Sequence, residues 1–518
     1  MRESRWQRHR EGPVSGGGSN QPAQDHGRAV GRPLPPVSLA LLTVLLGLLT
    51  LDRPAGSLDE MILVVYPERM MAGDLPYRDF FTAYGPAHWW LLQGAYEVLG
   101  ADVTSARMVG LLVHAALVLA TYWLILPYGR ALATAGGVIS ALLLLNLGAA
   151  PFAWLLTTAL CLANVAALRD GTRAKVLLAG ILAGLAISVR PDVGVLAVLP
   201  AVPLLWGRLA EARRWATGLV VGLAPFWLGL VLTGQALLSN VLGARAGKGA
   251  GQSRLPFWPN GNAARQLLLL LVVAVLLCCL LALRERSRIL IALACLSVAA
   301  LPQAFQRADG VHFVYAGLFS MPLLPLVAHE LLRSRFDRRA GRHGALAAGL
   351  LFIIVTPGWV LVPLLDEIRD AGPASVVVEH HGRRLPSDPD SARTLRQLLR
   401  TLDRETTPGQ TVFVYDNNLV RPAVNDVGLY HLLPSLRQDA YNMEITPGVT
   451  AFPGGRLLED LQEADVAVLI DIPEEFRTRL FPFSRNGSDE AQRELARSFC
   501  RLATVDYYAV YRRCVPRP

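Results

Sequence analysis

The chain has 518 residues, a net charge of +9 and a mean hydropathy of +0.36. Charged residues make up 18% and hydrophobic residues 52%, whereas soluble globular proteins carry about 25% charged residues. These values exclude an ordinary water-soluble globule and an intrinsically disordered chain. A pI near 9.5 is also typical of nucleic-acid binding, but the long apolar runs favour membrane topology as the explanation. All but two of the 50 basic residues are Arg, which favours a GC-rich bacterial source.

Residues 1–33 are polar, with six arginines and a Gly-Gly-Gly stretch. This composition predicts a disordered basic tail on the cytoplasmic side. The first long apolar run is 34–51. We interpret it as a retained membrane helix rather than a cleaved signal, because no convincing small-residue cleavage site follows it.

Ten further apolar runs have spanning or near-spanning length, which predicts a polytopic α-helical membrane protein of about eleven spans. They lie near 105–126, 131–149, 151–168, 176–189, 193–207, 215–233, 264–283, 289–301, 312–332 and 344–365. With this topology 21 Lys and Arg face inside, as the positive-inside rule requires. If 80–100 also crossed, most basic loops would move outside. We therefore expect 80–100 to lie at the outer surface as an amphipathic helix, with Trp89, Trp90 and Tyr96 at the interface.

This topology predicts a plasma-membrane protein with a membrane module at 34–366, a first outer loop at 52–104 and an extracytoplasmic domain at 367–518. The last segment carries a net charge of −3, against +12 for the rest of the chain. β-rich runs and helical patterns alternate along it, which predicts a small α/β domain with a partly parallel sheet. Strands are expected at Ser375–Glu379, Thr411–Tyr415, Ala464–Ile470 and Asp506–Tyr511, and helices at Ser391–Leu402 and Gly455–Glu463.

Six cysteines are present, and four of them fall in the predicted spans, where they are expected to be inert packing residues. Cys500 and Cys514 lie in the outside domain. In an oxidising compartment they could form a disulfide; the alternative is two free thiols, because spacing alone does not show the distance between them.

The first outer loop is rich in acids and contains the adjacent pair Asp59 and Glu60. Such a pair could act as a general base with its partner, or bind a divalent cation, Mg²⁺ or Mn²⁺, through its oxygens. The alternative is a solvated helix start, where acids interact favourably with the helix dipole.

Two basic motifs lie at the outer ends of predicted spans. The first contains Arg190 and Asp192, and the second contains Arg307, Asp309 and His312. Arg binds phosphate with a forked geometry, so Arg190 and Arg307 could hold a lipid phosphate, and His312 could donate to it. The alternatives are snorkelling arginines, Arg–Asp pairs within each motif, and a structural histidine.

Other signals exclude some classes of protein. No P-loop, dinucleotide-binding glycine motif, HExxH or paired CxxC is present in the sequence. No acid or base lies in the middle of a span, whereas a proton-coupled transporter normally needs ionisable groups near the midplane.

The chain resembles the GT-C superfamily of polytopic glycosyltransferases, in particular the branch of protein mannosyltransferases and aminoarabinose transferases. The resemblance covers about 50–366 and includes an outer loop with an acidic pair after the first span. The matching residues are Leu58–Met61, Tyr77–Phe80, Tyr84–Pro86, Arg190–Asp192 and Arg307, Asp309 and His312.

The resemblance implies sugar transfer, with inversion, from a polyprenyl-phosphate-linked donor to a cell-envelope acceptor at the outer membrane face. It implies that Asp59 is the catalytic base, with Glu60 as its neighbour, and that Arg78, Asp79 and Tyr84 help to bind substrate. One departure is that the turn Asn146–Pro151 has no acid, whereas several relatives place a second acid there. We consider Asp79 as the acid that takes the place of this missing second acid.

Two other classes of function remain as alternatives at this point. The first is a lipid or polysaccharide transporter, or a non-catalytic assembly factor of the envelope. The second is a sensor whose outside domain binds a ligand, although eleven spans are excessive for an anchor. The expected partners are the lipid-linked donor, an envelope glycan, lipid or protein acceptor, and membrane lipids, with no nucleic acid.

Overall fold

The computed structural model places the chain from Leu34 to Pro518 in one compact unit. It describes residues 36–56, 59–145, 147–243, 258–259, 261–306, 308–333, 349, 375–444, 456–480 and 487–515. The basic tail 1–33 and the predicted span 344–365 lie outside these ranges, apart from residue 349.

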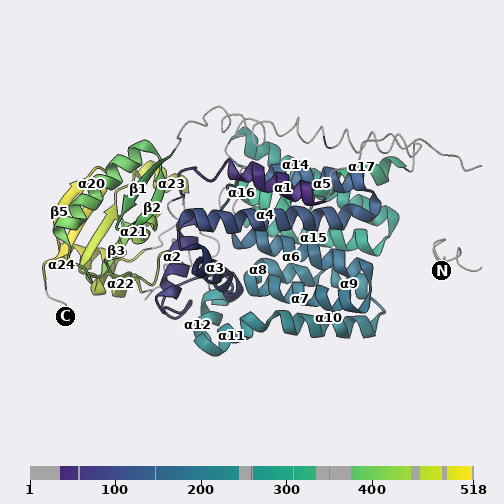
Figure 1. Cartoon of the computed structure of the whole chain (residues 1–518), viewed down its shortest axis with the longest axis horizontal. Coiled ribbons are helices and arrows are strands. Elements are labelled where there is room, and N and C mark those ends of the chain that lie inside the picture. Colours follow the sequence, from purple (N-terminus) through teal and green to yellow (C-terminus); the bar gives the residue numbers. More distant parts are fainter. Residues whose placement is uncertain are drawn as a thin grey trace, which may run out of the picture. The chain divides into compact units, whose positions relative to one another are not determined.

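The apolar runs that the structure describes form a bundle of helices (Figure 1). Their bounds are α1 (Pro36–Leu48), α4 (Val103–Ile125), α5 (Arg130–Leu145), α6 (Ala153–Asp170), α7 (Arg173–Val189), α8 (Pro191–Gly194), α9 (Ala201–Leu205), α10 (Leu209–Gly222), α11 (Ala224–Thr233), α12 (Gln235–Leu238), α14 (Asn262–Glu285), α15 (Arg288–Gln306), α16 (Gly310–Gly317) and α17 (Leu324–Arg333). Short helical turns join some of them, namely η1 (Leu126–Tyr128), η2 (Val195–Val198), η3 (Ser239–Gly243) and η4 (Met321–Leu323).

By length and composition, 3 helices of the described chain could each cross a membrane, or up to 5 if each bent pair counts as one span. The bends, of 41° and 48°, lie between α10 and α11 and between α16 and α17. Pro225 and Pro322 follow these breaks, and proline removes a backbone donor and clashes with the preceding helical turn. The total of eleven spans therefore stays a prediction.

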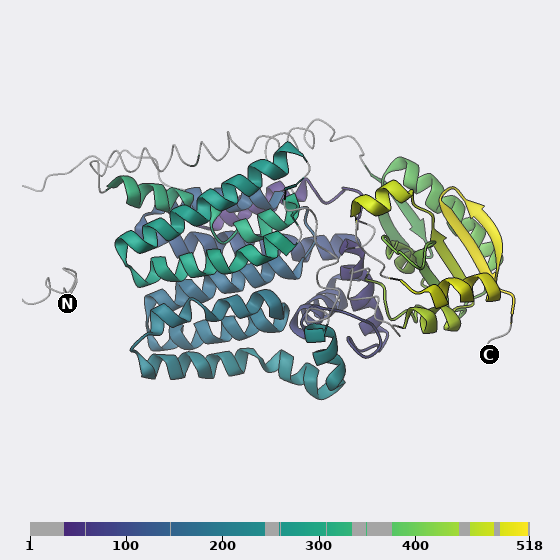
Figure 2. The ribbon, with the colours of Figure 1, turned by 180° about the vertical axis from the view of Figure 1, so that it is seen from behind.

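Helices α7 and α10 make the closest packing in the bundle, and they lie side by side in both views (Figure 1, Figure 2). Each carries two glycines four residues apart, Gly180 and Gly184 on α7 and Gly218 and Gly222 on α10. A Cβ at Gly180 would lie 2.0 Å from the Trp215 carbonyl oxygen. The small residues let the two backbones touch, which fixes the end of α7, where Arg190 lies.

The first outer loop folds into α2 (Asp59–Met71) and α3 (Pro86–Leu99). The expected helix at 80–100 is present, but the proposed interfacial role of its aromatic residues is wrong in part. Trp89 and Tyr96 are fully buried inside the protein, with the Trp89 ring 5.3 Å from that of Tyr66 on α2. These rings pack inside the protein, and the exposed apolar side of α3, which begins at Pro86, instead carries Leu91, Val98 and Leu99.

The C-terminal segment contains a four-stranded sheet of order β3-β4-β6-β5 and a separate hairpin of β1 and β2. β3 and β4 are parallel, whereas β6 is antiparallel to both of its neighbours, which confirms a partly parallel sheet. The strands are β1 (Val376–His380), β2 (Arg383–Ser387), β3 (Val412–Asp416), β4 (Val466–Ile470), β5 (Phe499–Val505) and β6 (Tyr508–Arg513).

Helices cover both faces of the four-stranded sheet (Figure 2). Val412 and Val414 point to one face, with the apolar side of α20, while Phe413 and Tyr415 point to the other, with α22 and α24. The helices are α20 (Pro389–Glu405), α21 (Gly428–Leu432), α22 (Leu457–Glu463), α23 (Glu474–Leu480) and α24 (Asp489–Ser498). The sequence analysis missed β2 and β5, because their exposed and charged positions hide the two-residue period that marks a strand.

The predicted boundary near 367 does not separate two hydrophobic cores. Met61, Tyr66 and Trp89 of the first outer loop belong to the same buried cluster as Leu398 of α20 and Val414 of β3. The first outer loop and the C-terminal segment therefore depend on each other for burial of their apolar side chains.

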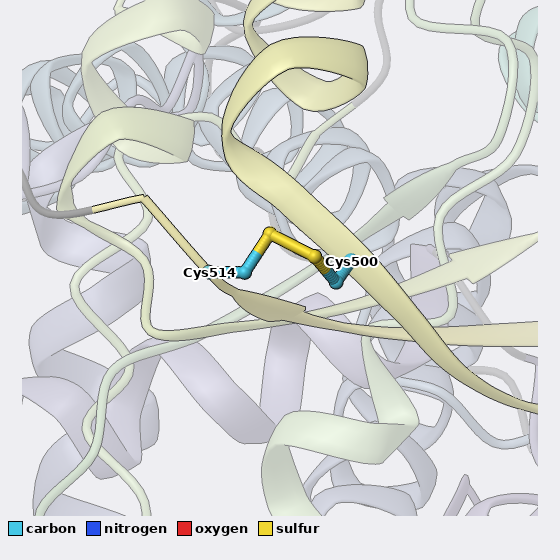
Figure 3. Close-up of a disulfide and its surroundings, with 2 residues drawn as sticks. All are labelled: Cys500 and Cys514. Carbon is cyan, nitrogen blue, oxygen red and sulfur yellow. A yellow bond between two sulfur atoms is a disulfide. The ribbon is translucent and has the colours of Figure 1, made fainter.

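Cys500 and Cys514 form a disulfide with a Cα–Cα distance of 5.7 Å, joining β5 to the end of β6 (Figure 3). The pairing that the sequence left open is thus present in the structure. Of the remaining cysteines, Cys161 and Cys278 are buried in the bundle.

We predict that replacing both members of this disulfide, in Cys500→Ser/Cys514→Ser, lowers the free energy of unfolding of the C-terminal segment by about 3 kcal/mol, as expected for a loop of roughly 15 residues. The cause is the release of chain entropy in the unfolded state. Pulse proteolysis in urea measures the midpoint. Cys295→Ser, which removes a free thiol from the bundle, is the control, and an unchanged midpoint in the double variant would contradict the prediction.

Candidate functional site

The adjacent acids of the first outer loop have different surroundings at the first turn of α2. Glu60 is buried, and its carboxylate accepts hydrogen bonds from Arg107 on α4 at 2.7 and 3.0 Å. It also accepts from the backbone N–H of Gly56 at 2.9 Å. Asp59 is exposed and has no ion pair among the residues that the structure describes. Glu60 is therefore an anchor, and Asp59 is the acid that remains available for chemistry.

Arg107 was not singled out from the sequence, although it organises this region. Besides Glu60, its guanidinium donates to the backbone carbonyls of Leu51 and Arg53, which follow α1. One buried cation thus connects α1, α2 and α4. The only signal in the sequence is an Arg near the start of a long apolar run. A snorkelling side chain would have the same sequence pattern.

Asp59 lines a cavity of about 420 Å³ at the end of the bundle where α2 begins. The opposite wall is the turn at 147–150 together with Phe152, the same turn that carries no acid. Since the Glu60 oxygens are occupied by Arg107 and Gly56, Asp59 is the single unpaired carboxylate among the described residues that line the cavity. A Mg²⁺ or Mn²⁺ ion normally takes several oxygen ligands, so the donor set here is poor for a cation.

Arg190 lies in a second group of residues, at the end of α7. Its guanidinium carbon lies 5.1 Å from the ring centre of Tyr84 and 5.4 Å from that of Trp154. Its Nε donates to Asp192 at 3.2 Å, and Asp192 also accepts from Gln303 at 3.3 Å. A cation held against two aromatic faces in a partly buried place keeps its charge with little solvent screening.

Tyr315 on α16 connects the two groups. Its ring stacks on Trp154 at 5.2 Å and lies 6.5 Å from Phe152, which lines the Asp59 cavity. It also interacts electrostatically with Asp59 and Arg190. The sequence analysis missed Tyr315, because an aromatic residue in an apolar run is indistinguishable from ordinary core.

The second basic motif is partly described. Asp309 caps α16, accepting from the backbone N–H of His312 at 2.9 Å, and its Oδ1 lies 2.8 Å from His312 Nδ1. The His312 ring contacts Tyr315, with the ring centres 5.9 Å apart. Arg307 lies outside the described residues, so its role stays a prediction.

Arg78 and Asp79 lie away from this site. Asp79 pairs with the exposed Arg78 at 2.7 Å, and the backbone carbonyl of Asp79 accepts from Arg69 near the other end of α2. The 13 residues of α2 span about 20 Å. The hydrogen bond from Arg78 lowers the pKa of the Asp79 carboxyl. Asp79 is therefore a poor substitute for a second carboxylate beside Asp59, because both its distance and its weakened basicity oppose that role.

The last turn of α2 is held by the C-terminal segment. Glu68 forms ion pairs with Arg383 at 2.7 Å and with the buried His431 at 3.0 Å. Arg69 is buried, pairs with Asp74 at 2.6 Å and donates to the Ala440 carbonyl. These contacts position α2, and hence Asp59 at its other end.

Asp460 of α22 is buried in the C-terminal segment, and its carboxylate accepts a hydrogen bond from the backbone N–H of Asn442 at 3.2 Å. Burial raises the pKa of its carboxyl to about 7. The group is therefore protonated in the folded protein at pH values where the unfolded chain has already lost the proton.

A second cavity, of about 620 Å³, lies between the first outer loop and the C-terminal segment. Its lining includes Ala55 and Met61 on one side and Asp426 and Tyr508 on the other, and Pro54 lines both this cavity and the Asp59 cavity. Asp426 accepts from the Tyr508 hydroxyl at 2.6 Å. Two adjoining spaces therefore meet at the residues that follow α1.

Comparisons with known proteins bear on the fold. No protein-family model matches the chain, and no curated protein matches it. ArnT from Cupriavidus metallidurans, solved bound to undecaprenyl phosphate, is similar in structure, with a TM-score of 0.53 and 14% sequence identity over 92% of this chain and 97% of ArnT. Its apo form gives the same TM-score and identity. The oligosaccharyltransferase of Archaeoglobus fulgidus matches with a TM-score of 0.45 and 12% identity over 84% of this chain and 69% of its own.

The similarity to ArnT extends over nearly the full length of both chains and includes the C-terminal segment. The chain therefore shares the fold of ArnT, in agreement with the resemblance that the sequence motifs indicated. At this level of identity the comparison establishes the fold and leaves the chemistry of the site to be argued from its residues.

We predict that Asp460 makes stability fall as pH rises. Its folded pKa of about 7 lies above the unfolded value of about 3.9, so between these values the folded state holds a proton that the unfolded state lacks. The contribution of this group to stability is thus lost progressively up to about pH 7. Asp460→Asn removes this dependence, since the amide resembles the protonated acid.

Thermal unfolding of the detergent-purified protein at pH 5 and pH 8 measures the effect. The Tm of Asp460→Asn relative to wild type should be higher at pH 8 than at pH 5. Asp390→Asn, at an exposed acid on α20, is the control and should show a constant difference. A constant difference for Asp460→Asn as well would contradict the prediction.

Proposed function

We propose that this chain is an inverting membrane glycosyltransferase that uses a polyprenyl-phosphate-linked sugar and acts on a cell-envelope acceptor at the outer face of the plasma membrane. The observation that carries the proposal is the unpaired Asp59 carboxylate, facing a cavity next to the Arg190 and Tyr315 cluster. It is supported by the shared fold with ArnT, which was solved with undecaprenyl phosphate. Sugar transfer from a phosphate requires a base for the acceptor and a cation for the leaving phosphate, and Phe152 and Tyr315 connect the Asp59 cavity with the Arg190 group.

In this mechanism Asp59 acts as the general base. Its carboxylate takes the proton of an acceptor hydroxyl, whose oxygen then attacks the anomeric carbon of the donor sugar as the bond to the phosphate oxygen breaks. Attack opposite the leaving phosphate inverts the anomeric centre. Because Arg107 holds Glu60 in an ion pair, the adjacent carboxylate does not compete for the proton.

Arg190 stabilises the negative charge that develops on the departing lipid phosphate. Its guanidinium has five N–H donors, and the hydrogen bond to Asp192 uses the Nε–H. Tyr84 and Trp154 hold the guanidinium in place through their ring faces. His312, oriented by Asp309, is a second donor within the same cluster, and Arg307 is assigned the same role from its place in the sequence.

The acceptor approaches through the second cavity. That space lies beside the C-terminal segment and shares Pro54 with the Asp59 cavity. Its lining combines apolar surface with Asp426, Asp471 and Tyr507, a mixture suited to sugar rings and hydroxyls. The C-terminal segment thus binds the acceptor, while the bundle binds the lipid-linked donor.

We predict that Asp59→Asn reduces turnover by at least about 100-fold, the usual contribution of a general base, with donor affinity retained. An assay of the purified protein with polyprenyl-phosphate sugars measures the rate. Asp52→Asn, at an exposed acid of the same loop, is the matched control and should retain activity. Equal turnover by Asp59→Asn and wild type would eliminate Asp59 as the base.

We predict that Arg190→Gln weakens binding of the polyprenyl phosphate by about 10-fold or more, as expected for loss of a charge-assisted contact of 1.5–3 kcal/mol. The change also lowers the rate of transfer. Binding of undecaprenyl phosphate measured by microscale thermophoresis tests this, with Arg78→Gln, at an exposed arginine outside the cluster, as the control. Unchanged binding by Arg190→Gln would remove this residue from the phosphate site.

A further inference from the structure

A cluster of metal-ligand side chains lies in the C-terminal segment, apart from the proposed donor site. His380 ends β1, His381 follows it in the hairpin turn, and Asp403 lies on α20. Their ligand atoms all lie within 4.8 Å of one another. In the part of the chain that the structure describes, this is the one group of three such residues that meets this criterion.

The hydrogen bonds of His380 fix which ring nitrogen carries its proton. Nδ1 lies 2.7 Å from the backbone carbonyl oxygen of Leu432, and a carbonyl only accepts, so Nδ1 must be the N–H donor. The other nitrogen, Nε2, then directs its lone pair at the Asp403 oxygens, 3.0 and 3.1 Å away. A lone pair and a carboxylate oxygen do not bond directly, so either a proton or a metal ion is shared between them.

His381 brings a third ligand to the same point. Its Nε2 lies 3.4 Å from Asp403 Oδ1, and its ring centre is 4.1 Å from that of His380. A single metal ion satisfies both nitrogens and the carboxylate together.

The backbone conformation at His381 places its side chain next to that of His380. Its φ is +47°, followed by +78° at Gly382, so both central residues of the two-residue turn are left-handed. Turns of this kind favour Asn-Gly or Gly-Gly, and His is among the non-glycine residues that adopt this conformation more readily than most. The turn places the His381 imidazole beside that of His380.

We propose that His380, His381 and Asp403 bind a divalent transition-metal ion of the zinc class. Zinc sites use imidazole nitrogens and carboxylate oxygens, and a ligating histidine usually donates its other N–H to a backbone carbonyl, as His380 does to Leu432. Three protein ligands leave one coordination position. His381 and Asp403 are 51% and 46% exposed, so that position is open to solvent.

The metal stabilises the part of the C-terminal segment that contacts the last turn of α2. It connects the hairpin turn to α20, and through His380 to Leu432 of α21. The preceding residue, His431, forms the buried ion pair with Glu68 of α2. The site thus connects elements of the C-terminal segment, and its ligands are not among the residues of the proposed donor chemistry.

The test uses the full-length protein in detergent, stripped with a chelator and titrated with Co²⁺ and Zn²⁺. We expect one equivalent of Co²⁺ to give the visible absorption of a site with nitrogen and oxygen ligands, Zn²⁺ to displace it, and the Tm to rise with metal. His381→Gln and Asp403→Asn should each weaken binding by about 10-fold or more, since each removes one of three ligands. Asp390→Asn, an exposed acid on the same helix, is the matched control.

Circular dichroism of each variant shows that it remains folded. If the stripped protein binds no Co²⁺, or if His381→Gln and Asp403→Asn bind it as tightly as wild type, the proposal is overturned. The cluster is then an imidazole–carboxylate hydrogen-bond group alone.

Discussion

The buried ion pair between Glu60 and Arg107 is the constraint on which the candidate site depends. Leaving either charge buried without its partner would cost several kcal/mol, so α2 and α4 are held at one fixed separation. The same guanidinium satisfies the carbonyls of Leu51 and Arg53, which ties down the chain that leaves α1. With these groups paired, the neighbouring Asp59 faces the cavity and keeps its carboxylate unpaired.

The other end of α2 is fixed by a different set of charges. Glu68 and Arg69 contact Arg383, His431 and the Ala440 carbonyl of the C-terminal segment. Since the first outer loop and the C-terminal segment also share one apolar core, neither is an independent module. Asp59 lies on the same helix as Glu68 and Arg69, so the contacts of the C-terminal segment help to position the helix that carries Asp59.

Most of the site residues lie at the ends of helices, at one end of the bundle. Asp59 begins α2, Arg190 follows α7, and Asp309 caps α16. The apolar helix interiors carry packing, for example the glycine contacts between α7 and α10. This arrangement accompanies a fold that is shared with ArnT at 14% sequence identity.

The sequence by itself indicated most of the bundle helices that the structure describes, four of the six described strands and the acid-rich loop, because apolar periodicity and charge are local properties that a short window contains. It also singled out Asp59 and Arg190. Tertiary structure decided that Glu60 is an anchor, that Asp79 lies elsewhere, that Trp89 is buried and that Arg107, Tyr315 and the His380 cluster matter. Those assignments depend on contacts between residues far apart in the chain, such as the 47 positions between Glu60 and Arg107. Local periodicity carries no information about such pairs; only the packed helices bring them within hydrogen-bond distance.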